Sequence, residues 1–371
     1  KEEEEGKRMH STVADTLMEP STVFCVAVGL LIFIGLATKP KNLRGWLLPR
    51  IRWDTVERIQ HTLRSKPADL WFSSFPFLGN EIQYVLMLPF MAWFFPDGGI
   101  TLRRFTLGAF LACYLSNAVK TKTCLPRPPL RLHVGTSEHV GGAARDEHKR
   151  IAQQFGFPST HSAHAVLLST IFAHATIQLW AGRIAFVVCH TAHVILSRLY
   201  MGVHSLADVL GGLAVGTLLV GGGFAPCQAL SDTLADEGGA RAIAITAALL
   251  IGLLIAFPDK RGSTYEETVS FAGVYFGVFC GCRRDAWGLR AVVDDGVVSM
   301  PILASHYVAG LLALGLVRTA VSKAAKLAVK LVVPAGRAAD FIGFVRVLLV
   351  NAFAGWYVMA IHPSNLVAAF R

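Results

Sequence analysis

Residues 197–208, which read SRLYMGVHSLAD, join two long apolar runs at 182–199 and 205–224. Each run is long enough to cross a bilayer as a helix, because about 20 apolar residues span the hydrocarbon core. The stretch therefore places a group of polar side chains at the edge of two predicted membrane spans. Its polar side chains include Arg198, His204 and Asp208.

The same apolar pattern recurs along the whole chain. Of its 371 residues, 53% are apolar and 16% are charged, and the mean hydropathy is +0.49. Soluble proteins average about 25% charged residues, so the apolar surplus here favours a lipid environment. We predict an all-α polytopic membrane protein with about ten transmembrane helices. The apolar runs lie near 21–38, 79–95, 103–119, 160–180, 182–199, 205–224, 241–257, 265–281, 302–318 and 342–361.

Three regions are expected along the chain. Residues 1–20 form a polar tail whose acidic start is the wrong charge for a secretory signal, so the run at 21–38 would remain as a signal-anchor helix. Residues 21–224 hold six apolar runs, and residues 225–371 hold further runs with no recognisable chemistry. Near 45–66, aromatic and aliphatic residues alternate with Arg and Lys, which predicts an amphipathic helix in the membrane interface.

The charge and cysteine content narrow the function classes. The 35 Lys and Arg residues against 25 Asp and Glu give a formal charge of +10. In a membrane protein this surplus points to anionic headgroups or anionic substrates, and nucleic acid is the weaker interpretation. The seven cysteines form neither a disulfide framework nor a zinc-binding pattern.

Two further polar clusters precede residues 197–208, and each lies at the edge of an apolar run. If successive spans alternate in direction, all three clusters open on one face of the membrane and can form a single pocket. The first cluster is Lys120 with Arg127-Pro128, after the third run, and the second is Pro158-Ser159-Thr160-His161, at the start of the fourth.

His204 and Asp208 suggest a nucleophile. They are four residues apart at the start of a predicted helix, hence on one face of it. The carboxylate can then accept Nδ1–H and leave Nε2 of the imidazole to attack an electrophile.

The other polar residues suit a phosphoryl group. Lys120, Arg127 and Arg198 supply cations for phosphoryl oxygens. Ser159 and Thr160 begin a helix and offer hydroxyls and unpaired backbone N–H groups to an anion. His161 would be the general acid that protonates a leaving alkoxide.

Together the three clusters resemble the tripartite signature of the type 2 phosphatidic acid phosphatase superfamily. The stretch at 197–208 and the sequence YVLMLPF at 84–90 resemble the sphingosine-1-phosphate phosphatases more closely. The resemblance implies a six-helix phosphatase core at 21–224 and no metal or other cofactor. It also implies that His204 is a phosphohistidine nucleophile, Asp208 its partner and His161 the acid. The implied phosphate ligands are Lys120, Arg127, Ser159, Thr160 and Arg198.

One residue departs from the pattern. Thr160 stands where the superfamily usually has glycine, so its Cβ and hydroxyl are expected to crowd the pocket. Of the other histidines, His164 could line the pocket, whereas His174, His190 and His193 are expected to serve packing or contacts between helices.

A pocket at the membrane surface suits a substrate whose phosphate lies at the headgroup level while its single chain stays in lipid. The resemblance implies the endoplasmic reticulum with a lumenal site, although most of the 35 Lys and Arg residues fall on the predicted active-site side, which the positive-inside rule would place in the cytosol. The oligomeric state is left open.

Three alternatives remain at this stage. The same chemistry could act on a polyprenyl diphosphate or a glycerolipid phosphate. The histidine and aspartate could instead serve a lipid phosphotransferase. A transporter is the alternative from another class, but the polar clusters lie at span edges rather than along a midplane path.

Overall fold

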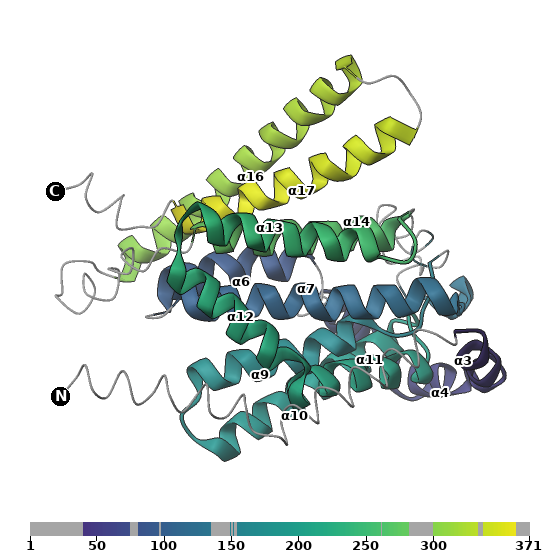
Figure 1. Ribbon diagram of the computed structural model, residues 1–371. Coiled ribbons are helices and arrows are strands. Elements are labelled where there is room, and N and C mark those ends of the chain that lie inside the picture. The colour runs from purple at the N-terminus through teal and green to yellow at the C-terminus, as the bar shows by residue number, and fades with distance from the viewer. Residues whose placement is uncertain are drawn as a thin grey trace.

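The computed structural model describes residues 40–74, 81–95, 98–134, 149, 151, 154–260, 262–281, 300–332 and 337–360. Within these ranges the fold is helical, and its only extended pairing is an isolated bridge between Pro126 and Phe155 (Figure 1). The tail at 1–20 and the run at 21–38 lie outside the described residues. The helices are α3 (Pro40–Leu47), η1 (Leu48–Arg50), α4 (Asp54–Leu63), α5 (Lys66–Ser74), α6 (Glu81–Phe94), α7 (Gly98–Thr123), η3 (Leu130–Leu132), α9 (Thr160–Thr176), α10 (Trp180–Tyr200), α11 (Leu206–Leu218), η5 (Leu219–Gly223), α12 (Phe224–Glu237), α13 (Gly239–Ala256), α14 (Ser263–Gly281), α16 (Met300–Val332) and α17 (Arg337–Ala360).

The all-α prediction is confirmed for the described residues. Every predicted apolar run after residue 78 falls on a helix, including the run at 265–281 with Glu266 and Glu267 at its edge. The count of about ten spans stays a prediction. By length and composition, four segments of the described chain can cross a membrane: Trp180–Tyr200, Leu206–Glu237, Gly239–Ala256 and Tyr307–Ala324.

Helix α12 is a feature that the apolar runs did not indicate. It continues from α11 through the π-helical turn η5, where Gly222 has a φ of 157°, a conformation that suits a residue without Cβ. Asp232 of α12 binds Arg103 at 2.7 Å and Arg104 at 2.9 Å, both from α7. These ion pairs compensate the charge of Asp232, one of the polar residues that interrupt the hydrophobic pattern of α12.

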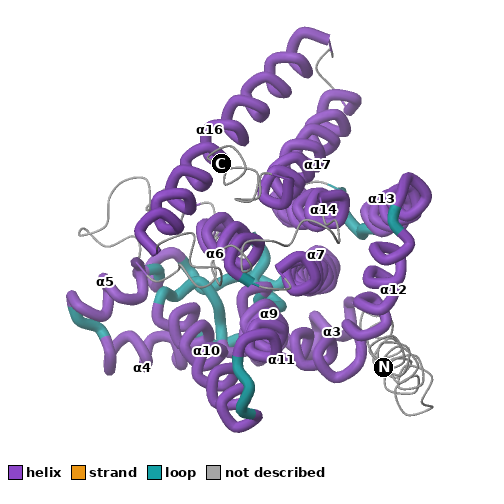
Figure 2. Tube along the Cα trace, turned by 90° about the vertical axis from the view of Figure 1, so that its left-hand side faces the viewer, coloured by secondary structure: helices purple, strands orange, loops and turns teal. Residues whose placement is uncertain are grey.

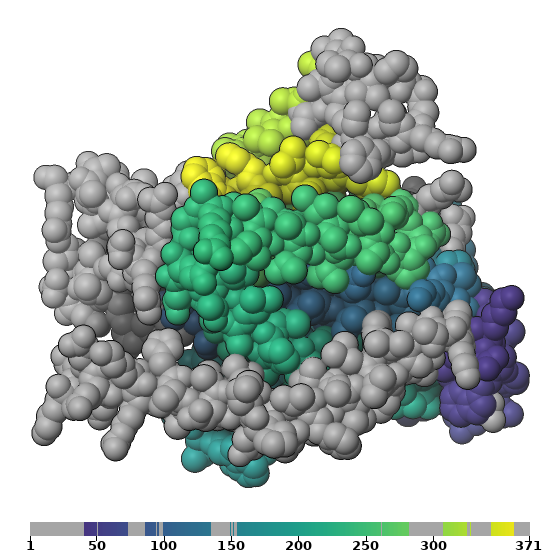
Figure 3. Space-filling view, viewed as in Figure 1, coloured from purple at the N-terminus to yellow at the C-terminus, as the bar shows by residue number. Residues whose placement is uncertain are grey.

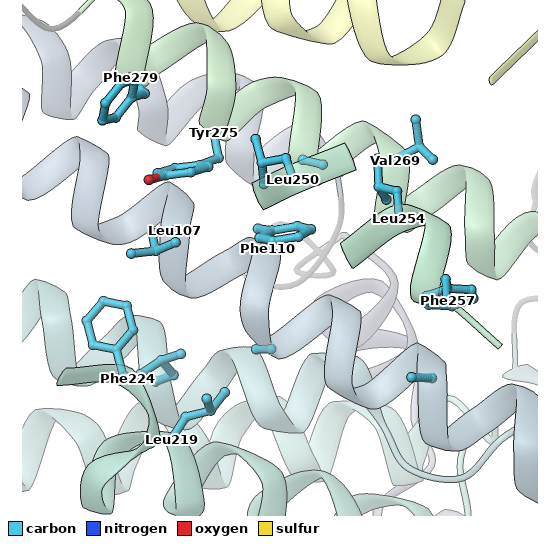
Figure 4. Packing of buried hydrophobic residues seen from close by; sticks show 14 of the residues in the cluster. Leu107, Phe110, Leu219, Phe224, Leu250, Leu254, Phe257, Val269, Tyr275 and Phe279 are labelled. Atoms are coloured by element: carbon cyan, nitrogen blue, oxygen red, sulfur yellow. The ribbon is translucent and has the colours of Figure 1, made fainter. Parts of the chain in front are cut away.

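Helix α7 lies at the centre of the bundle. Seen nearly end-on in Figure 2, it is surrounded by α6, α9, α12 and α14. Leu107 and Phe110 of α7 belong to a buried cluster with residues of η5, α12, α13 and α14 (Figure 4). The members labelled on those other elements or beside them are Leu219, Phe224, Leu250, Leu254, Phe257, Val269, Tyr275 and Phe279.

Helix α14 packs between α7 and α17. In the space-filling view the surface of α12–α14 borders that of α7 on one side and that of α17 on the other (Figure 3). On α14, Gly273, Gly277 and Gly281 recur every four residues and approach α17 so closely that a Cβ atom at any of them would clash. Such a stripe of small residues lets two helices pack with their backbones in near contact, an arrangement common in membrane-protein bundles.

The surface segment before α6 is more divided than the single amphipathic helix predicted near 45–66. It forms α3, η1, α4 and α5, with Trp46, Leu70 and Trp71 among its exposed apolar side chains. Arg44 of α3 donates hydrogen bonds to the carbonyls of Thr123, at 2.8 Å, and Cys124, at 2.5 Å. These two hydrogen bonds cap the C-terminal end of α7.

Helix α4 also holds a loop in place. Gln60 Nε2 donates to the carbonyl oxygens of Leu132, at 2.7 Å, and Tyr200, at 2.8 Å. One amide therefore joins the segment after α7 to the end of α10.

Candidate active site

The ends of four helices bring the three polar clusters together at one end of the bundle. The first and second clusters are joined by Lys120 Nζ, which donates to Thr160 Oγ1 at 3.0 Å. The second and third are joined by the backbone N–H of Ser159, which donates to the carbonyl of Asp208 at 2.9 Å. The first and third are joined by the guanidinium of Arg127 and the ring of His204, at 3.0 Å. Each cluster therefore contacts both others, as the alternating spans predicted.

His204 lies in the turn between α10 and α11 and is 1% exposed. Its Nε2 is the atom that faces Arg127 Nη1. A guanidinium can only donate, so Nε2 is the acceptor and the ring proton resides on Nδ1. The imidazole thus presents an unprotonated nitrogen toward the cations.

The electrostatic surroundings favour the neutral ring. Burial holds the pKa of His204 well below its ordinary value of 6.5, and the charges of Arg127, Lys120 and Arg198 act in the same direction. Burial also lowers the pKa of Arg127 to about 10, while the carboxylates of Asp208 and Glu267 oppose that shift. At neutral pH the site therefore combines an uncharged imidazole with a charged guanidinium.

Asp208 contacts His204 and also caps a helix. Its Oδ2 lies 3.5 Å from Nδ1 of His204, which is longer than a good hydrogen bond. The same oxygen accepts the backbone N–H of Ser205 at 2.7 Å, and Ser205 Oγ accepts the N–H of Asp208 at 3.2 Å, so the two form a capping box at the start of α11. The capping box fixes the carboxylate on the Nδ1 side of the imidazole, where the sequence predicted it.

Ser159 and Thr160 start α9. Ser159 is fully buried and is the N-cap, with its hydroxyl accepting from the N–H of Ser162 at 3.4 Å. The hydroxyl of Thr160 contacts Lys120 and, at 3.4 Å, Oδ1 of Asn117. The side chain expected to crowd the pocket is therefore held by hydrogen bonds to α7.

His161 and Arg198 complete the predicted set. The rings of His161 and His204 are 6.3 Å apart between centroids and inclined by 58°, so both can reach one phosphoryl group. Arg198, at the end of α10, is 7% exposed and donates through Nε and Nη2 to Ser197 Oγ, both at 3.2 Å.

Histidines outside this group take other roles. His164 Nε2 contacts the carbonyl of Ala109 at 2.9 Å, and its ring packs on Phe271, so it faces α7 and α14. The rings of His190 and His193 pack on aromatic neighbours, as expected. His174, by contrast, is exposed at the far end of α9, so the packing expected for it is not found. In the part of the chain that is described, no group of three or more His, Cys, Asp or Glu residues could hold a metal ion.

The sequence did not single out two residues beside the site. Asn117 lies one turn before Lys120 and accepts a hydrogen bond from its ammonium at 3.0 Å. Asn117 in turn donates to Glu267 of α14 at 3.1 Å. The spacing of Asn117 from Lys120 was a signal available in the sequence, whereas Glu267 is 150 residues from Asn117 and only the fold brings it close.

Comparison with known proteins supports the resemblance drawn from the motifs. Residues 101–226 match the family model of the PAP2 superfamily. Lipid phosphate phosphatase delta of Arabidopsis thaliana is 26% identical over 282 residues, which cover 70% of this chain and 64% of that protein. Dihydrosphingosine 1-phosphate phosphatase YSR3 of Saccharomyces cerevisiae is 26% identical over 255 residues, 64% of this chain and 58% of the relative.

Sphingosine-1-phosphate phosphatase 1 of Rattus norvegicus is 26% identical over 235 residues, 61% of this chain and 50% of the relative. The chain thus spans less than two thirds of the length of each of these relatives. No solved structure matches the chain significantly.

Proposed function

We propose that the chain, whose residues 101–226 match the PAP2 superfamily, is an integral membrane phosphatase of single-chain lipid phosphates. Its substrate would be sphingosine 1-phosphate or a related long-chain-base phosphate, and its products the base and inorganic phosphate. The observation that carries this proposal is the convergence of the three polar clusters, in which Arg127 contacts Nε2 of His204 and Lys120 donates a hydrogen bond to Thr160. The printed names of the relatives support the choice of substrate.

The reaction would proceed in two displacements at phosphorus. In the first, Nε2 of His204 forms a bond to phosphorus as the bond to the lipid oxygen breaks, and His161 gives a proton to that oxygen. In the second, His161 takes a proton from water, whose oxygen attacks phosphorus and breaks the N–P bond. Inorganic phosphate leaves, and both histidines return to their starting state.

The cations would stabilise the phosphoryl oxygens in both steps. Arg127 donates a hydrogen bond to Nε2 of His204 in the structure. When a phosphoryl group binds, the guanidinium would donate to its oxygens instead, which would leave Nε2 able to attack phosphorus. Asp208, on the Nδ1 side, would stabilise the positive charge that the imidazole gains. No step of this mechanism calls for a metal ion.

The substrate class is testable by phosphate release. The purified full chain in detergent is given sphingosine 1-phosphate, phosphatidate or a polyprenyl diphosphate, with and without EDTA. We expect the long-chain-base phosphate to be hydrolysed at least about tenfold faster than the other two, with equal rates in EDTA. Preference for another lipid would reassign the substrate, and loss of activity in EDTA would contradict the metal-free mechanism. If none of the three is hydrolysed, the transporter alternative gains support.

We also propose that the active site faces the lumen of the endoplasmic reticulum. The chain has no N-x-Ser/Thr acceptor, so single substitutions can report sidedness. Gly135→Asn creates Asn-Thr-Ser on the predicted active-site side, and Met9→Asn creates Asn-His-Ser in the tail on the opposite side. We expect a glycosidase-sensitive gel shift for Gly135→Asn and none for Met9→Asn. The reverse pattern would place the site in the cytosol.

A further inference from the structure

Asn117 links the proposed phosphate site to a helix far along the chain. It is fully buried in α7. Its Oδ1 accepts from Lys120 Nζ at 3.0 Å and from Thr160 Oγ1 at 3.4 Å. Its Nδ2 faces α14, where it lies 3.1 Å from Glu267 Oε2, 3.1 Å from the carbonyl of Thr264 and 3.2 Å from Thr268 Oγ1.

The hydrogen-bonding chemistry permits only this orientation of the amide. An ammonium has donors alone, so the atom of Asn117 beside Lys120 must be the oxygen. A carboxylate and a backbone carbonyl have acceptors alone, so the atom beside Glu267 and Thr264 must be the nitrogen. Asn117 therefore cannot rotate its amide without breaking contacts on both sides.

The ammonium of Lys120 donates two hydrogen bonds to described residues, which leaves its third N–H for a ligand. Its ammonium carries three N–H groups. Among the described residues, two of them are taken by Asn117 Oδ1 and Thr160 Oγ1. With the ammonium fixed by these two bonds, the third N–H has a defined direction for a phosphoryl oxygen.

Glu267 contributes a negative charge to this buried network. It is half-buried on α14, a helix beyond the segment matched by the PAP2 superfamily. Its neighbour Glu266 is exposed. Of the two glutamates, Glu267 is therefore the more buried and is the one that contacts Asn117.

We propose that Asn117 and Glu267 are positioning residues that act through Lys120, so that α14 supports the phosphate site. Asn117 fixes the ammonium, and Glu267 fixes the amide of Asn117 while it places a carboxylate behind the cations. This inference rests on the proposed phosphatase function for its activity readout, and an anion-binding readout tests it separately.

The first measurement compares Glu267→Ala with Glu266→Ala, a matched control on the same turn. We expect Glu267→Ala to lower kcat/KM by about tenfold and to weaken binding of orthovanadate by a similar factor, and Glu266→Ala to change both by less than about twofold. Thermal unfolding in detergent is followed in parallel. If Glu267→Ala unfolds early, Glu267→Gln keeps an acceptor for Asn117 and isolates the loss of charge. Full activity and full vanadate binding in both Glu267 variants would overturn the proposal.

A double-variant cycle separates positioning from general structural support. If Glu267 acts through Lys120, Glu267→Ala has no further effect on kcat/KM or vanadate binding once Lys120→Ala is present. A second, independent tenfold loss in that background would show a structural role and overturn the inference. A wild type that binds vanadate but releases no phosphate would contradict the proposed function, and the vanadate cycle would still decide the role of Glu267.

Discussion

Replacing His204 with alanine is expected to abolish phosphate release, lowering kcat by about 1,000-fold or more, because the proposed reaction has no other nucleophile. His204 is almost fully buried, and its Nε2 faces Arg127. The measurement is phosphate release at saturating substrate. A second readout is covalent labelling of the chain by a substrate with radioactive phosphate, quenched in alkali, where an N–P bond survives.

His174→Ala is the control for this prediction. His174 lies in the last turn of α9, is exposed and is far from the site. We expect wild-type turnover and labelling from it. If His204→Ala keeps more than about a tenth of the activity, or if wild type and His204→Ala are labelled equally, the phosphohistidine mechanism is wrong.

Removing the guanidinium of Arg127 is expected to have the second largest effect. Arg127→Ala deletes a cation that contacts Nε2 of His204 at 3.0 Å and the carbonyl of Val203 at 2.8 Å. Loss of one buried charged donor for the transition state costs about 100-fold to 1,000-fold in kcat. Arg127→Lys is expected to recover only part of this, because an ammonium cannot make two parallel bonds to a phosphoryl group.

The matched control is Arg131→Ala. Arg131 is four residues away, and its side chain is 71% exposed, where it pairs with Glu57 at 3.4 Å. Surface ion pairs contribute little, so activity should stay within about twofold of wild type. Equal losses from the two alanine variants would mean that the loop responds to any loss of charge, and that Arg127 has no specific role.

The sequence predicted the parts of the site that depend on local spacing. Lys120 and Arg127 follow one apolar run, and His204 and Asp208 open another, so alternating spans were enough to bring them to one face. Their roles stay predictions until the variants are measured. The apolar runs likewise predicted the long helices from α6 to α17 other than α12, because a helix that spans a membrane requires a long apolar stretch.

What the sequence could not show depends on contacts between distant segments. Helix α12 contains the charged residue Asp232, and the sequence does not show that Arg103 and Arg104 of α7 form ion pairs with it. Spacing likewise cannot indicate that Arg44 of α3 and Gln60 of α4 form hydrogen bonds with the backbone of other segments. Hydrophobic periodicity carries no information about such partners.

The hydroxyl of Thr160 shows the same limit. From sequence alone it could only be expected to crowd the pocket, since its hydrogen-bond partners were unknown. The structure turns it to Lys120 and Asn117, two residues of α7. A polar side chain in place of glycine is thus accommodated by neighbours some forty residues earlier.

Two of the buried amides, Gln60 and Asn117, indicate that residues 101–226 do not form an intact unit by themselves. A fragment trimmed to residues 101–226 would remove Gln60 from the carbonyls of Leu132 and Tyr200, and Glu267 and Thr268 from Asn117. Each buried polar group left without a partner costs about 1–3 kcal/mol, which is a sizeable share of the stability of one domain. A fragment intended for expression should therefore begin no later than Pro40 and, because α14 packs closely on α17, end no earlier than Ala360.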